Sequence, residues 1–119
     1  LEFSEKMAGL GIQPIAGIQL TVDFADGEGG ARNGQGACAN LVLLAQSEEG
    51  YGNLMRLASA AHFDDPGAHR TCVAFPRLEA WSAGLIALTG GLDGPLDRAL
   101  RDGRDELARQ RLDRLTSIF

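Results

Sequence analysis

The chain has 119 residues, of which 45% are apolar and 23% charged, the composition of one soluble globular domain. Eleven basic and sixteen acidic side chains give a formal charge of −5, which excludes a strongly basic chain that coats DNA or RNA by itself. No apolar run approaches the roughly 20 residues that span a bilayer, so we expect a cytoplasmic chain without membrane contact. Cys38 and Cys72 are too few for a disulfide framework and lack metal-ligand spacing, which predicts two cytosolic thiols.

Helical and strand patterns alternate along the chain, which predicts an α/β architecture with mostly parallel strands. Apolar residues three and four apart mark the helices, whereas alternation and short apolar runs mark the strands. In chain order, the predicted elements are a helix over the first ten residues, a strand within 12–24, a glycine-rich loop at 25–38, a strand at 41–45, a helix from Ser47 to His62, a loop at 64–72, a short helix at 76–81, a strand at 84–88 and helices at 95–101 and 104–119.

Three of these helices have a predicted apolar face, and one loop is predicted to be mobile. The glycine-rich loop holds five glycines between Gly27 and Gly36, whose ordering entropy predicts one of the most mobile segments. The apolar faces are Phe3, Met7 and Leu10 in the first helix, Tyr51, Leu54, Met55, Ala58 and Ala61 in the second, and Ala108, Leu112, Leu115 and Phe119 in the last.

Two stretches carry residue types that could form a binding site, and each has a plainer interpretation. Residues 89–94 lie between a strand and a helix, where backbone N–H groups can cradle a phosphate. They contain no Lys or Arg, so a tight turn is the better prediction. His62 and His69, with Asp64 and Asp65 between them, have the side chains of a zinc site but lie in a polar region that we expect to be solvated surface.

The C-terminal helices carry charges of both signs. Residues 97–114 hold six arginines and five carboxylates, which predicts a salt-bridged helical face and no nucleic-acid patch. No arrangement of Ser, His and Asp, or of Cys and His, stands out elsewhere. From the residues alone we predict no catalytic residue and no cofactor.

Four segments, in their order and spacing, resemble the PHP (polymerase and histidinol phosphatase) domain at the N-terminus of bacterial replicative DNA polymerase III α subunits. Residues 50–54 and 88–91 resemble the replicative enzymes more than the related error-prone α-like polymerases. The four segments are GIQPIAG at 11–17, LVLLA at 41–45, EGYGNLMRL at 49–57 and GLIALTGG at 84–91.

The resemblance implies part of a distorted (β/α)7 barrel with helices outside, and residues 1–119 as one incomplete domain from its middle. Family members with an intact site bind metal ions through His, Asp, Glu and Cys at one barrel end and hydrolyse phosphoesters, including as a 3′–5′ exonuclease. Gln19, Asn40 and Gly91 stand where the family's acidic residue, His and Cys are expected. An amide lacks the charge of a carboxylate and the donor nitrogen of an imidazole, and glycine lacks the sulfur of a cysteine. The resemblance therefore implies a degenerate metal site.

Two functional hypotheses follow. The first is a structural and interaction module of a replicative polymerase, which contacts the rest of the α subunit, meets DNA only through the parent polymerase and docks the proofreading exonuclease subunit. The second is a working metal-dependent phosphoesterase or exonuclease. Both chain ends lie inside predicted helices, so we expect a piece of a larger protein. Strands 12–24, 41–45 and 84–88, left without their neighbours, predict that the segment self-associates through open strand edges.

Overall fold

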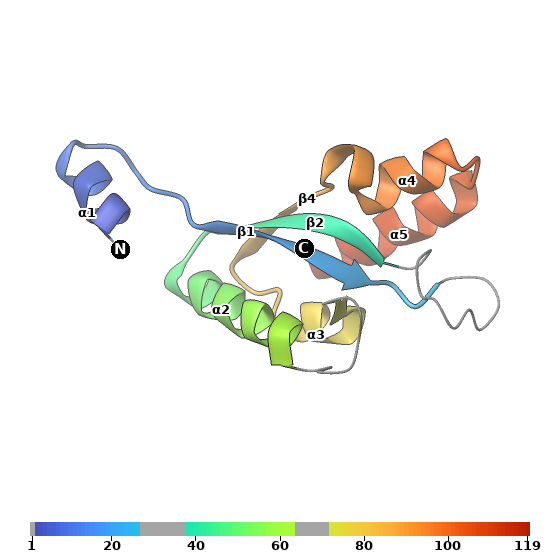
Figure 1. The fold of residues 1–119 in the computed structure, drawn as a ribbon, viewed down its shortest axis with the longest axis horizontal. Coiled ribbons are helices and arrows are strands. Elements are labelled where there is room, and N and C mark those ends of the chain that lie inside the picture. The colour runs from blue at the N-terminus through green and yellow to red at the C-terminus, as the bar shows by residue number, and fades with distance from the viewer. Residues whose placement is uncertain (1, 27–37, 64–71) are drawn as a thin grey trace.

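The computed structural model describes residues 2–26, 38–63 and 72–119, which form a mixed α/β unit with one sheet (Figure 1). The strands are β1 (Gly17–Asp23), β2 (Cys38–Ala45), β3 (Val73–Ala74) and β4 (Leu85–Leu88). The helices are α1 (Glu2–Gly9), α2 (Glu48–Phe63), α3 (Phe75–Ala80), α4 (Pro95–Arg101) and α5 (Asp105–Ile118), with one 3-10 turn, η1 (Gly91–Asp93).

The predicted helices and longer strands are confirmed, with two shifted boundaries. Residues 12–16 precede β1 instead of belonging to it, and β2 begins three residues before the predicted 41–45 run. The glycine-rich loop at 27–36 and most of the 64–72 loop lie outside the described residues. The predicted motion of the first loop therefore stays a prediction.

The strand order is β3-β1-β2-β4, and the prediction of mostly parallel strands is wrong. β2 pairs antiparallel with both β1 and β4, and only the short β1–β3 ladder is parallel. β1 and β4 are both antiparallel to β2, and β3 is parallel to β1, so β1, β3 and β4 run in the same direction. The sequence between β1 and β2 is glycine-rich without helical periodicity, whereas adjacent parallel strands need a crossover connection, usually a helix, so this sequence favours antiparallel pairing.

The buried core lies on one face of this four-stranded sheet. Leu20 faces Leu41 in the β1–β2 register, and both belong to the core cluster. That cluster also includes Leu57 of α2, Leu78 of α3 and Leu115 of α5, so helices pack against this face of the sheet. The structure confirms helices packed on a sheet, but the described residues form an open sheet and not a closed barrel.

Helix α2 starts as predicted, yet its buried face differs from the predicted one. The Gly50 N–H donates to Ser47 Oγ at 3.1 Å, the expected N-terminal cap. Leu54 is buried as predicted and Ala61 packs against the core, but Tyr51 and Met55 are each 52% exposed. Asn53 and Leu57, which the predicted face did not include, are buried. The Asn53 side chain faces inward, where its amide nitrogen donates to the Ala83 carbonyl at 2.9 Å. The buried face of α2 is therefore rotated relative to the predicted apolar face.

Helix α5 buries a charged residue that the apolar pattern did not include. Ala108 and Leu115 are buried as predicted, but Leu112 is 43% and Phe119 39% exposed. Arg111, 2% exposed, occupies the buried face between Ala108 and Leu115 instead. It is satisfied there by Asp26, whose two carboxylate oxygens accept from Nε and Nη2 at 2.8 Å each.

Helix α1 is confirmed, but its apolar side chains find no core. It contains no buried residue, and Phe3 and Leu10 are 67% and 72% exposed. Figure 1 shows α1 set apart from the sheet, beyond the start of β1.

Candidate functional site on the open sheet face

The second face of the sheet, which we call the open face, carries the residues expected at the family's metal site. By the observed register, this face consists of the side chains that alternate with the core positions. None of them belongs to the buried core cluster. The open face comprises Gln19, Thr21, Asp23, Cys38, Asn40, Val42, Leu44, Ile86 and Leu88.

The sheet brings Gln19 and Asn40 together. Asn40 stands opposite Thr21, two residues along β1 from Gln19, so the two amides are diagonal neighbours. The Thr21 hydroxyl donates to Asn40 Oδ1 at 2.9 Å, which fixes the half-buried Asn40 side chain. Gln19 is exposed.

The third expected position, Gly91, lies at the border of the same region. Its neighbour Gly90 follows β4 and passes so close to β2 that a Cβ there would lie 2.6 Å from the Asn40 carbonyl oxygen. Gly90 and Gly91 both have positive φ, 77° and 66°, and lead into η1. A Cβ on Gly91 would meet nothing within 4 Å, so this position has room for a side chain but supplies none.

The donor chemistry at the three expected positions is neutral. Gln19 and Asn40 supply amides and Gly91 supplies no side chain, without imidazole or carboxylate. The carboxylate that the register places on this face, Asp23, is the last residue of β1 and accepts from the Ala25 N–H at 2.8 Å. Within residues 2–26, 38–63 and 72–119, no three His, Cys, Asp or Glu side chains are grouped to hold a metal ion.

The other sequence candidates fall elsewhere. Residues 89–94 form the predicted tight turn, with the Gly94 N–H donating to the Gly91 carbonyl at 2.8 Å. His62 is exposed in the last turn of α2, and its three predicted companions lie outside the described residues. No helix in the part of the chain that the structure describes has the length and apolar character needed to cross a membrane.

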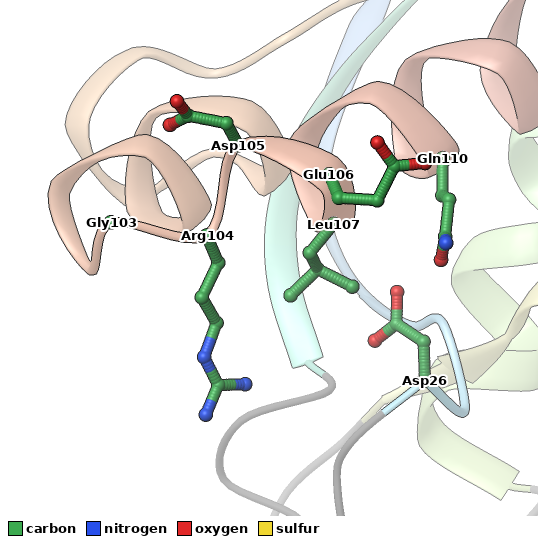
Figure 2. A pocket seen from close by; sticks show the side chains of 7 residues that line it. All are labelled: Asp26, Gly103, Arg104, Asp105, Glu106, Leu107 and Gln110. Carbon is green, nitrogen blue, oxygen red and sulfur yellow. The ribbon is translucent and has the colours of Figure 1, made fainter.

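Two surface pockets flank the sheet. One, of about 390 Å³, lies between Asp26 and the stretch 103–110, which leads into and forms the start of α5. Figure 2 shows that the carboxylates of Asp105 and Glu106 point away from Asp26, which is instead paired with Arg111. The other, of about 350 Å³, is mostly apolar and lies between β2, the end of β4 and α5, where Leu41, Ala87 and Phe119 line it.

Sequence reasoning missed one pair of reactive groups. The thiol of Cys72 donates to Cys38 Sγ, with the two sulfur atoms 2.8 Å apart. The spacing of 34 residues carries no signal for this contact, which depends on β1 separating β2 from β3. Only the strand order could have predicted it.

Comparison with known proteins decides the family. The model of the PHP domain matches residues 1–119, the whole chain. The chain belongs to the PHP domain family. In this PHP segment only β2 runs against the other strands. Gln19 and Asn40 are neighbours on the open face, and Gly91 follows Gly90, which lies close to Asn40.

The relatives compared with this PHP segment are named as DNA polymerases or as subunits of one. DNA polymerase III subunit alpha of Caulobacter vibrioides is 37% identical over 120 residues, covering 100% of this chain and 10% of that protein. The subunit alpha of Thermus aquaticus is 33% identical over 126 residues with the same coverage. An error-prone DNA polymerase of Anaeromyxobacter dehalogenans is 37% identical over 100 residues, covering 77% of this chain and 8% of that protein. The chain spans about a tenth of the length of these relatives.

Proposed function

We propose that this segment is a structural and interaction module of the PHP domain of a replicative DNA polymerase III α subunit, with a degenerate metal site. The observation that carries the proposal is the open face, where two amides and a glycine stand at the three expected ligand positions. Full coverage by relatives named DNA polymerase III subunit alpha favours a replicative parent over an error-prone one. Such a protein acts in the cytoplasm.

The residues present do not fit a zinc or manganese centre. Such centres use imidazole nitrogen, thiolate or carboxylate, which supply charge or strong donation. Asn40 Oδ1 already accepts a hydrogen bond from Thr21, and Gln19 offers only a neutral amide. We therefore derive no hydrolytic step through a metal ion on this face.

The alternative function is a metal-dependent phosphoesterase or 3′–5′ exonuclease. A nuclease assay separates the two: purified protein of full natural length is incubated with single-stranded DNA and Mn²⁺ or Zn²⁺, with and without EDTA. We expect nucleotide release at the same background rate in both arms. Release that requires the metal and disappears in the Asn40→Ala variant would contradict the proposal. Val42→Ala, which keeps both amides and the Thr21–Asn40 hydrogen bond, is the matched control for changes on this face.

The module's partners follow from its uncovered apolar surface. The apolar pocket at Leu41 and Phe119, together with the open face, supports packing against the rest of the α subunit. We include the proofreading exonuclease subunit among the proposed partners because the family resemblance implies it, without assigning residues to that contact. Failure of that subunit to copurify with the full-length protein would remove it from the proposal. DNA is reached only through the parent polymerase.

Studied alone, the segment is expected to self-associate. In the part of the chain that the structure describes, β4 forms one edge of the sheet, and β3 pairs only with Val22 and Asp23 of β1. Most of β1 therefore keeps an open edge as predicted, whereas the predicted open edge at β2 is wrong, because β2 lies between β1 and β4. Ile86 and Leu88 of β4 are 44% and 47% exposed on the open face beside an unpaired strand edge, which favours pairing with a second copy.

Sedimentation of the segment tests this expectation. The double variant Ile86→Lys, Leu88→Lys should weaken association by roughly tenfold or more, since two charges would face the apolar edge of a second copy. Leu100→Lys, an exposed leucine on α4, is the control and should leave association unchanged. A wild-type monomer at high concentration would contradict the expectation.

A further inference from the structure

Two cysteines far apart in the sequence meet beside the sheet. The sulfur atoms of Cys38 and Cys72 are 2.8 Å apart, and both residues are thiols. A disulfide bond is about 2.05 Å long, so its formation requires less than an ångström of closure between the two sulfur atoms. The proposed function does not use these two thiols.

The sheet holds both cysteines in place. Cys38 is the first residue of β2 and stands opposite Asp23 of β1. Cys72 directly precedes Val73, which pairs with Val22 on the other edge of β1. β1 therefore fixes both chain segments that carry the thiols, and the Cys38 carbonyl is further held by Arg98 Nη1 at 2.7 Å.

The two thiols differ in access. Cys38 is 7% exposed, whereas Cys72 is only half-buried. A reagent from solution therefore reaches Cys72 first, and Cys38 is positioned to react with whatever forms on Cys72. This is the arrangement of an accessible attacking thiol beside a resolving thiol.

We propose that Cys38 and Cys72 form a reversible intramolecular disulfide by exchange with a low-molecular-weight disulfide. The Cys72 thiolate attacks one sulfur of that disulfide, whose S–S bond breaks and releases one thiolate. The Cys38 thiolate then attacks the Cys72 sulfur of the mixed disulfide, forms the Cys38–Cys72 bond and releases the second thiolate. The two protons lost by the cysteines protonate the two released thiolates, so one disulfide is reduced while the pair is oxidised.

The cross-link would join the starts of β2 and β3 across β1. It closes a span of 34 residues, a length for which cross-linking markedly restricts the unfolded chain. In the oxidised protein we therefore expect the melting transition of this region to rise by on the order of 10 °C. Reduction by excess thiol should reverse the rise.

Peptide mapping of the protein at its full natural length tests the proposal. Folded protein is incubated with excess oxidised glutathione, alkylated, digested with trypsin and analysed by mass spectrometry without reduction. Peptides 33–56 and 71–77 contain the two cysteines, and we expect them joined at roughly tenfold the abundance of either glutathionylated peptide, because neighbouring thiols outcompete free glutathione. Urea-unfolded protein treated identically should lose this preference.

Two variants serve as controls. Cys72→Ser should abolish the linked peptide and leave Cys38 resistant to alkylation until the protein is unfolded. Cys38→Ser should instead accumulate glutathione on Cys72. The proposal is overturned if folded wild-type protein carries glutathione on Cys72 with Cys38 still a thiol, if both remain thiols, or if either cysteine links mainly to a third one.

Discussion

Arg111→Ala is expected to lower the free energy of unfolding by about 3 kcal/mol, because it leaves the partly buried Asp26 carboxylate without its cation. The Arg111 side chain is 2% exposed and that of Asp26 16%, so little water can replace the lost guanidinium. Arg111 also donates to the Pro95 carbonyl at 3.1 Å and stacks 5.1 Å from the Phe24 ring centre. One substitution thus removes contacts that join α5 to α4 and to the end of β1.

Urea unfolding of matched variants measures this effect. Arg109→Ala changes an exposed arginine on the same helix and should stay within about 0.5 kcal/mol of wild type. Arg111→Lys should recover only part of the loss, because an ammonium cannot bind both carboxylate oxygens in the guanidinium geometry. In the Asp26→Ala background, the cost of Arg111→Ala should shrink by about 1–3 kcal/mol. Equal stability of the Arg111→Ala and Arg109→Ala variants would show that the pair contributes nothing.

Gly50→Ala is expected to cost about 3 kcal/mol through overpacking of two backbones. A Cβ at Gly50 would lie 1.9 Å from the Gly84 carbonyl oxygen and 2.6 Å from its carbon. That oxygen also accepts from the Gln46 N–H at 2.8 Å, so it cannot move aside without breaking the bond that joins the connection between β2 and α2 to the residue before β4.

Gly52 supplies the matched control two residues along α2. A Cβ there meets nothing within 4 Å, so Gly52→Ala should stabilise the helix by about 0.5–1 kcal/mol through its lower backbone entropy. The two variants add the same methyl group to the same helix, and opposite signs in their urea midpoints are the predicted result. A Gly50→Ala variant as stable as Gly52→Ala would contradict the close approach.

The positions of the helices and of the three longer strands could be predicted from the sequence, but the strand directions could not. Periodicity located α2, α3, α4 and α5 to within a few residues because it depends only on local spacing. The direction of β2 depends on how the glycine-rich sequence after β1 leads the chain into β2, and the spacing of apolar residues carries no information about that path. The prediction that Tyr51 and Met55 are buried is wrong because an apolar pattern treats Asn53 as a surface residue. Asn53 is in fact buried, since its side chain bonds the Ala83 carbonyl.

The candidate site was predicted in part. Family resemblance singled out Gln19 and Asn40, and the β1–β2 register places them as neighbours. The charge pattern predicts that Arg111 belongs to a salt-bridged face of the C-terminal helices. A sequence pattern cannot show that Asp26, 85 residues away, lies within 2.8 Å of its guanidinium. The Cys38–Cys72 contact depends in the same way on strands that meet only in the folded sheet.

Metal content tests the central claim, a PHP segment without a metal centre on its open face, most directly. Full-length protein, purified without chelators and dialysed against Zn²⁺ or Mn²⁺ and then metal-free buffer, is measured by inductively coupled plasma mass spectrometry beside its Gln19→Ala and Asn40→Ala variants. We predict the same metal content in all three proteins. Stoichiometric zinc or manganese that is lost when either amide is removed would contradict the claim.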